Sequence, residues 1–368
     1  MLKNIKKFSI SRQKLVLLIL EWSVGFRPAG SVWVLLLALR GFSLVEIGFA
    51  ETMFHIVSLC CELPSGLLAD VLGRKWTLTA SSVMFVLSPL LMMASQGIAG
   101  VCLSLAVSAL GYNLESGTRE SITYESMLQA GQGTDYLKFS SLQNVVYRFS
   151  SGGAMLLAGA TVLLDWRRAY LFDTGISLIG LMAALSITEP ERDAPGITLR
   201  MLPAALAETV RCAWAILKAD GTAVQIMVLN ALVGTCAILT GFYLQEKVET
   251  AVTVPALLGP ALFALGLGGG LAGLLTGRLD RLSYPKVVAV TGGGVLLCAL
   301  AARGTCLPVL MASGLLAGLL DDSLQLVSDK KLNDRFPSTQ RATLISVSSM
   351  IFSFFMIPLS PLFGWWFS

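Results

Sequence analysis

Charged residues are scarce in this sequence. Asp, Glu, Lys and Arg make up 14% of its 368 residues, whereas hydrophobic residues make up 55% and the mean hydropathy is +0.73. Soluble domains usually contain about 25% charged residues, so this composition excludes an ordinary soluble protein and predicts a membrane protein. The net charge of +4 is small and gives no reason to expect nucleic acid as a partner.

Histidine and paired cysteines are also lacking, which removes the usual ligands of a metal site. The chain has one histidine, and its seven cysteines show no paired ligand spacing. We therefore expect neither a metal nor a disulfide framework. Most of the cysteines lie in apolar runs and are expected to be small packing residues: Cys60, Cys61, Cys102, Cys212, Cys236, Cys298 and Cys306.

The glycine clusters at 266–273 and 292–294 do not have the features of a phosphate-binding loop. They lack the strand-turn-helix setting and the Lys-Ser/Thr ending, and small residues in membrane helices more often allow close packing or bending. The sequence also contains no hydrolytic triad and no cofactor fingerprint. We therefore expect no cofactor and no enzyme, so any energy that the protein uses must come from an ion gradient or from a solute.

Long apolar runs recur along the whole chain. About 20 residues are needed for a helix to cross a hydrocarbon core of about 30 Å. Because the runs are continuous and do not alternate, they predict helices and not a barrel. We expect an all-α membrane protein with about eleven transmembrane helices, at 15–39, 44–69, 77–94, 98–118, 137–164, 169–187, 222–245, 255–276, 285–302, 305–327 and 344–367.

Basic residues in short loops predict the orientation of these helices, because they favour the cytoplasmic side. Lys3, Lys6 and Lys7 precede the first span and place the N-terminus in the cytoplasm. With that orientation, only a few basic residues lie on the outer side of the membrane: Arg40, Arg167, Arg168, Lys247 and Arg303. The expected location is the inner membrane of a bacterial cell.

The polar stretch at 188–221 divides the chain into two bundles. Its first part is rich in Pro, Gly and charge, and its second part has apolar residues at helical spacing with Arg200, Glu208, Arg211 and Lys218 interleaved. We expect a six-helix bundle at 1–187, a cytoplasmic linker at 188–221 and a five-helix bundle at 222–368. The linker should contain an amphipathic helix of about 20 residues that lies against membrane lipid.

The stretch "GLLADVLGRKWTL" at 66–78 places three charges between two apolar runs. Gly66 and Ala69 are small and are expected to allow close helix packing, while Asp70, Arg74 and Lys75 should fall in the tight turn before the third span. Charges in such a turn can pair with one another or with helix ends. We expect this segment, with Gly73, to be a conformational latch between the bundles and not a solute site.

This stretch resembles the loop signature of the major facilitator superfamily, through Gly66, Asp70, Gly73, Arg74 and Lys75. The fourth span adds "SGTRESITYESML", which is similar to a pattern in a bacterial subgroup of that family and brings Glu125 into the expected latch. The loop at 273–286 repeats Gly-Leu-Leu with basic residues, as expected for parallel repeats. The resemblance implies two bundles that alternate between inward-open and outward-open states around a central cavity.

Three features depart from the family pattern. Asn113 stands where many proton-coupled members have Arg, and the Gly-Pro pair typical of antiporters is missing from the fifth span. The family usually has twelve spans, and eleven are predicted here. The twelfth is therefore expected to be dispensable, replaced by a partner chain, or lost by truncation.

Charged side chains inside spans are costly, so they usually face a cavity or a partner. Glu115 and Arg119 share a helix face, which is typical of a local ion pair and equally compatible with proton or solute binding. The acidic and basic residues inside the spans of the first half are Glu21, Arg27, Glu51, His55, Glu62, Glu115, Arg119, Glu120 and Arg148. In the second half, Asp321 and Asp322 could bind a cation or a proton, or cap their helix end.

Glu21 and Glu115 are the first choices for a proton site. The resemblance places the first and fourth helices at the cavity, and burial favours the protonated form of a carboxyl group. Glu51 and His55 also share a face, although a lone histidine on an apolar helix is more often structural. Several aromatic residues could form an apolar cavity for amphipathic solutes: Trp22, Trp33, Phe54, Tyr112, Phe242 and Tyr243.

These features predict a secondary active transporter. The preferred version is an antiporter that couples proton entry to efflux of a small amphipathic or drug-like solute. Solute uptake or facilitated transport is one alternative, and a degenerate binding protein without transport is the other.

Overall fold

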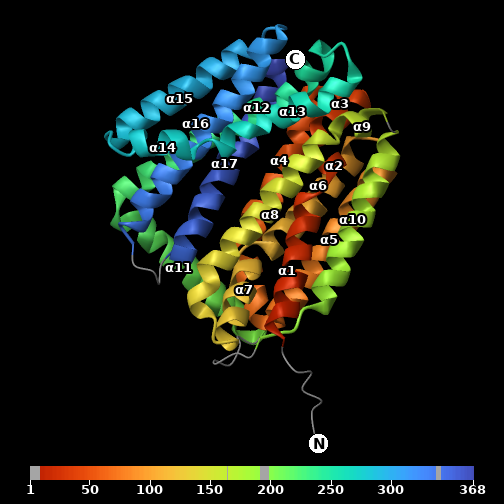
Figure 1. Ribbon diagram of the computed structural model, residues 1–368. Helices are drawn as coiled ribbons and strands as arrows, with labels where there is room; N and C mark the ends of the chain where they lie inside the picture. Colours follow the sequence, from red (N-terminus) through yellow and green to blue (C-terminus); the bar gives the residue numbers. More distant parts are fainter. Residues whose placement is uncertain (1–8, 164, 191–198, 337–340) are drawn as a thin grey trace, which may run out of the picture.

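The computed structural model describes residues 9–163, 165–190, 199–336 and 341–368, and this part of the chain is helical and has no strand (Figure 1). By length and composition, nine of its helical segments could cross a membrane. They are Leu44–Leu72, Arg74–Ala94, Ile98–Gln129, Trp166–Ser186, Gly221–Ala251, Leu258–Leu279, Tyr284–Ala301, Leu307–Asn333 and Leu344–Phe367. The chain is therefore a multi-pass membrane protein.

The other two predicted spans are helical but interrupted. The first consists of α1 (Ile10–Gly25), α2 (Pro28–Ser31) and α3 (Trp33–Leu39), and the fifth consists of α8 (Tyr136–Leu156) and α9 (Ala158–Leu163). The break in the first span follows from Pro28, since a proline disfavours helical dihedrals in the residue before it. Arg27 accordingly has φ −126° and ψ 86°.

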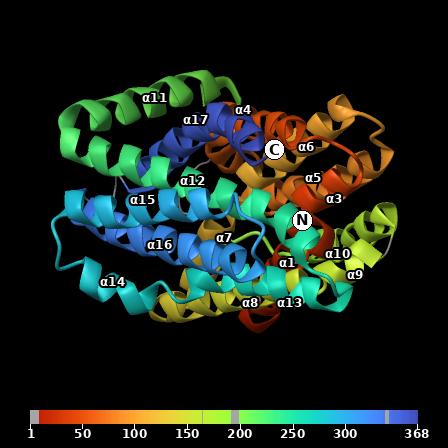
Figure 2. The ribbon, with the colours of Figure 1, turned by 90° about the horizontal axis from the view of Figure 1, so that it is seen from above.

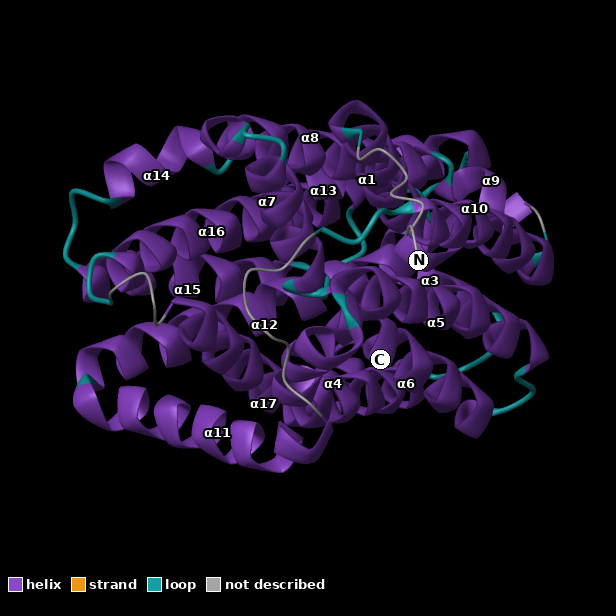
Figure 3. Ribbon diagram, turned by 90° about the horizontal axis from the view of Figure 1, so that it is seen from below, coloured by secondary structure: helices purple, strands orange, loops and turns teal. Residues whose placement is uncertain are grey.

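The remaining helices of the first half are α4 (Leu44–Leu72), α5 (Arg74–Ala94), α6 (Ile98–Glu115), α7 (Thr118–Gln129) and α10 (Trp166–Ser186). The second half contains α12 (Gly221–Ala251), α13 (Leu258–Gly270), α14 (Gly273–Leu279), α15 (Tyr284–Ala301), α16 (Leu307–Asn333) and α17 (Arg341–Phe367). Between the halves, α11 (Leu202–Ala219) packs against both α4 and α17. Figures 2 and 3 show α11 along the edge of the molecule beside α17.

The two halves share one apolar core at one end of the molecule. It includes Leu37 of α3, Ile47 of α4, Tyr170 of α10, Tyr243 of α12 and Met356 of α17. The other apolar clusters of the described residues each lie within one half or between α11 and the second half. We call the end with α3 and α9 the outer end and the end with α7 and α11 the inner end, following the predicted orientation (Figure 1).

The outer seal depends on a close crossing of α4 and α17. A Cβ atom at Gly48 would lie 2.5 Å from the carbonyl oxygen of Ser360, and one at Gly364 would collide with the carbonyl of Leu44. Backbone is therefore in contact with backbone, which only glycine permits here. The crossing joins the first half to the second half directly.

Substitution of Gly48 by leucine should open this seal, because overpacked cores cost about 1–3 kcal/mol or force helices apart. We expect spin labels on the outer ends of the two halves to show a longer distance distribution in Gly48→Leu than in the wild type. Gly175→Leu is the matched control, because no atom of the described residues lies within 4 Å of a Cβ at Gly175. An unchanged distribution and unchanged thermal stability in Gly48→Leu would contradict the proposed seal.

Candidate functional site

A cavity of about 650 Å³ lies between the two halves. Its wall contains many hydroxyl groups, from Ser31, Ser58, Ser88, Ser104, Ser108, Ser151, Ser349 and Ser353. Its aromatic side chains are Trp33, Phe54, Phe85, Tyr112, Tyr147, Tyr170, Phe242 and Phe352. Two residues of the predicted aromatic cavity are elsewhere, because Trp22 stacks on Phe26 and the hydroxyl of Tyr243 donates to the carbonyl of Ser360 in the shared core.

Four acidic or basic residues line this cavity, and three were predicted: Arg27, Glu51 and His55. The fourth, Asp173 of α10, was missed, although an acid inside the span at 169–187 was the signal that could have identified it. Its carboxylate accepts hydrogen bonds from the backbone N–H groups of Ala29 (3.2 Å) and Gly30 (2.8 Å). These bonds hold α2 against α10.

Glu51 and His55 lie where α4 meets α17. His55 Nε2 is 3.3 Å from Glu51 Oε1, and His55 Nδ1 is 3.2 Å from the hydroxyl oxygen of Ser353. Because the histidine contacts an acid of its own helix and a hydroxyl of the other half, its hydrogen bonds span the boundary between the halves. One helical turn before Ser353 on α17, and two turns after His55 on α4, the hydroxyl of Ser349 donates to Glu62 Oε2.

Glu21, Glu115 and Arg119 form a compact cluster in the first half. The Nη1 atom of Arg119 is 2.8 Å from Glu115 Oε1 and 3.2 Å from Glu21 Oε1. Both acids are buried, and the second oxygen of Glu21 has no hydrogen-bond partner among the described residues. The sequence predicted the pair of Glu115 with Arg119 from its spacing, but could not show that Glu21 joins it from α1.

Arg148 of α8 faces the second half. Its Nη1 atom lies 3.9 Å from Asp322 Oδ2 on α16, so this ion pair crosses between the halves. Both side chains are partly exposed, and the energy of such a pair is about 1 kcal/mol or less. Asp321, the neighbouring acid, approaches Gly234 of α12 instead.

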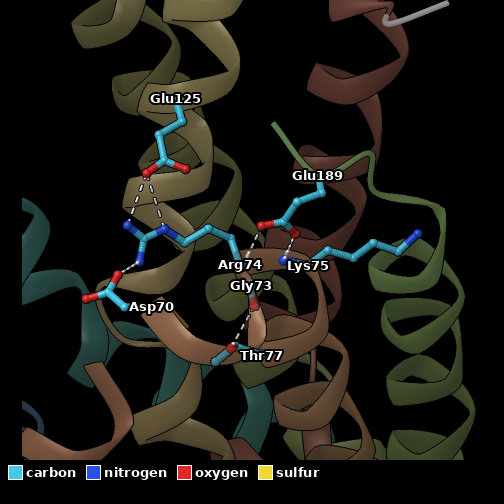
Figure 4. Close-up of polar contacts among 7 residues, drawn as sticks. All are labelled: Asp70, Gly73, Arg74, Lys75, Thr77, Glu125 and Glu189. Atoms are coloured by element: carbon cyan, nitrogen blue, oxygen red, sulfur yellow. Dashed lines mark hydrogen bonds and ion pairs between the residues drawn. The ribbon is translucent and has the colours of Figure 1, made fainter. Parts of the chain in front are cut away.

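The expected latch residues meet at the inner end of the first half (Figure 4). Gly73 alone joins α4 to α5 and has φ +102°, a conformation that glycine adopts without strain. Arg74 bridges two helices, with Nη1 3.0 Å from Asp70 Oδ1 and Nη2 3.0 Å from Glu125 Oε1.

Glu189 completes this cluster from the segment after α10. Its two oxygens accept the backbone N–H groups of Arg74 (2.8 Å) and Lys75 (2.6 Å), which satisfies the first turn of α5 (Figure 4). Sequence reasoning missed Glu189 because it lies in the linker, far from the signature. Lys75 enters the cluster through its backbone, while its ammonium group lies over the ring of Trp76.

The expected close packing at Gly66 is wrong for this conformation. Among the described residues, no atom lies within 4 Å of where its Cβ would be, whereas Ala69 is buried. The reason is that α4 makes its closest crossing with α17 at Gly48, near its outer end. The small residue is therefore not needed for contact at the inner end in this state.

The second half has its own ion pairs at the inner end. Asp280, after α14, contacts the ammonium group of Lys330, and Asp220, before α12, lies 2.7 Å from Arg335. The hydrogen bond from Lys330 lowers the pKa of the Asp280 carboxyl group. Hydrogen bonds from the backbone N–H of Ala223 and from Arg335 lower the pKa of Asp220. Each pair ties the end of α16 to a neighbouring element.

The family profile described as Major Facilitator Superfamily matches residues 17–301. An uncharacterized MFS-type transporter of Mycobacterium tuberculosis is 25% identical over 270 residues, and myo-inositol transporter 1A of Cryptococcus neoformans is 25% identical over 214 residues. The alignments cover 69% and 57% of this chain but only 38% and 36% of those proteins. The chain thus spans well under half the length of the curated relatives it matches.

Solved structures of transporters have the same fold. A mutant of the nucleoside transporter NupG superposes with a TM-score of 0.77 at 15% identity, covering 95% of this chain and 90% of that one. A D-xylose-proton symporter superposes with a TM-score of 0.70 at 15% identity, covering 96% of this chain and 90% of that one.

A bacterial homolog of the human lysosomal transporter Spinster, in an inward-facing and unoccupied conformation, also has a TM-score of 0.70. Its identity is 16%, and the superposition covers 97% of this chain and 82% of that one. At this identity the solved structures show only that the fold is shared. The family follows from the profile match, because that match covers more than half of the chain. The chain belongs to the Major Facilitator Superfamily.

Proposed function

We propose that this chain is a proton-coupled secondary transporter of the bacterial inner membrane, with its N-terminus in the cytoplasm. It exports a small amphipathic solute by alternating access, as an antiporter. Its family and fold support a membrane transporter and not an enzyme. The direction, the proton coupling and the solute class are our proposal.

The observation that carries the proposal is the cavity between the halves. Its wall includes residues of α1 to α6, α8 and α10 together with Phe242 of α12 and Phe352 of α17, so relative motion of the halves reshapes it. The shared core closes the outer end. We therefore assign this conformation to the inward-facing state, with residues 1–187 and 222–368 moving as units joined by the linker at 188–221.

Glu21, Glu115 and Arg119 are the proposed proton site. Two carboxylates share one guanidinium, so the cluster has a net charge of −1 when both acids are ionised. Addition of one proton gives a neutral cluster that keeps one ion pair, which hydrocarbon tolerates better than an excess charge. The unpartnered oxygen of Glu21 is a position where that proton can reside.

Solute uptake is the second candidate. It is supported by the similarity in fold to a D-xylose-proton symporter. Both candidates use the same cavity and differ in the direction in which the solute and the proton move. Transport in vesicles of opposite orientation separates them.

Inside-out vesicles that contain the protein should accumulate fluorescent amphipathic compounds when a proton gradient, acidic inside, is imposed. The accumulation should disappear when the gradient is collapsed and should be absent from vesicles without the protein. Accumulation that occurs only in right-side-out vesicles would replace export with uptake. Folded protein that moves no compound in either orientation would contradict proton-coupled transport of this solute class.

Glu21→Gln and Glu115→Gln should each uncouple transport from the proton gradient, because an amide cannot take up the proton. We expect solute exchange down its own gradient to remain, while gradient-driven accumulation falls to the level without a gradient. Asp135→Asn is the control, since this acid of the same half is exposed and has no ion pair within the described part of the chain. Full proton-driven accumulation in the double variant would remove both acids from the coupling site.

Asp70→Asn should slow the exchange between states and leave equilibrium binding of the solute unchanged. We take the pair of Asp70 with Arg74 to be strengthened in the transition between the states, so its loss raises that barrier by about 1 kcal/mol and slows the exchange about fivefold. Asp135→Asn, an exposed acid of the same half, is the control. Stopped-flow transport and equilibrium binding measure the two effects, and a variant with weakened binding at unchanged turnover would reject the latch.

A further inference from the structure

Arg27 has an unusual position among the arginines of the spans. It follows the 16 residues of α1, which rise about 24 Å, so it lies within a hydrocarbon core of about 30 Å, toward its outer side. Its side chain lines the cavity. The backbone break before Pro28 places it there, because Arg27 belongs neither to α1 nor to α2.

The guanidinium is held in one position but has no ionic partner. It lies over the ring of Phe85, 4.6 Å from the centroid, and its Nε donates to the carbonyl of Val24 at 3.0 Å. Within the described part of the chain, no carboxylate approaches within 4 Å of it, and its two terminal amino groups donate to no protein atom. By contrast, Arg119 and Arg148 each contact an acid.

The acids that line the same cavity are engaged with other groups. The carboxylate of Asp173 accepts two backbone N–H groups, and Glu51 is 3.3 Å from His55. Asp173 is near enough to offset part of the charge of Arg27, since a Cβ at Gly30 would lie 3.4 Å from Arg27 Cβ and 3.5 Å from Asp173 Oδ2. Its oxygens nevertheless leave the terminal amino groups of Arg27 free.

We propose that Arg27 binds a carboxylate of the solute, and that the transported solutes are small amphipathic organic acids. An arginine fork donates two parallel hydrogen bonds to a carboxylate, and such charge-assisted bonds are strongest in a partly dehydrated cavity. The aromatic wall, including Phe85 beneath the guanidinium and Phe54, packs against the apolar body of the acid. The proposal rests on the proposed function only in taking this cavity as the solute site.

The test is equilibrium binding to the purified full chain in lipid nanodiscs without any ion gradient. The probes are 3-phenylpropionate and indole-3-propionate, each compared with its neutral amide of the same shape. We expect each acid to bind about tenfold more tightly than its amide, since hydrogen bonds to charged groups contribute most. In Arg27→Gln the acids should bind as weakly as the amides, whose affinity should not change.

Two further variants separate recognition from folding. Arg12→Gln removes an exposed positive charge from the same span and should keep the preference for the acids. Asp173→Asn removes a negative charge beside Arg27 and should strengthen binding of the acids relative to the amides. A purely structural role of Arg27 would instead weaken binding of acids and amides together.

The proposal is overturned if neither acid binds more tightly than its amide, or if Arg27→Gln keeps the preference. Because binding is measured without a gradient, that result leaves proton-coupled export of neutral or cationic solutes standing. If the acids bind selectively but a proton gradient drives no transport, the role of Arg27 is supported and the proposed proton coupling is rejected.

Discussion

The constraint that shapes this molecule is the cost of a charge in hydrocarbon. Each ionised side chain in a span needs a partner, a backbone donor or a cavity. Arg119 meets this need with two acids, Asp173 with the N–H groups of α2, and Arg148 with an acid of the other half. The pairing separates the span charges into small groups, and each group joins residues of at least two helices.

The first span connects two of these groups. Glu21 is on α1 in the cluster with Arg119, and Arg27 follows six residues later at the break that lines the cavity. A change of charge at Glu21 therefore acts on the same short helix whose end positions Arg27. Asp173 holds the other side of the break through α2. This arrangement gives the proposed proton site and the proposed solute site a common mechanical element, although they lie in different surroundings.

The sequence predicted the membrane fold because hydrophobic length is a strong signal, and it predicted contacts between residues close in the chain. Glu115 with Arg119 and Asp70 with Arg74 are four residues apart on helices or across one turn. Contacts between distant segments were not predictable in this way. Glu189 and Asp173 reach their partners from 115 and 144 residues away, and one sequence carries no signal of which helices pack together. The sequence analysis did not predict the interruption of the first span. Its only sequence signal is Pro28, which acts locally on the dihedral angles of the preceding residue.

The single-residue joint at Gly73 has a mechanical consequence. No loop separates α4 from α5, so the two helices cannot move independently. The opposite end of α4 is in backbone contact with α17 at Gly48. From Gly48 to Gly73 the chain rises about 37 Å along α4, which stays one helix through Pro64, so α4 can act as a lever with its fulcrum at the outer seal. A tilt of about 10° at that fulcrum would displace the inner end by about 6 Å. The displacement would carry α5, and with it the ion pairs of Arg74, as one body.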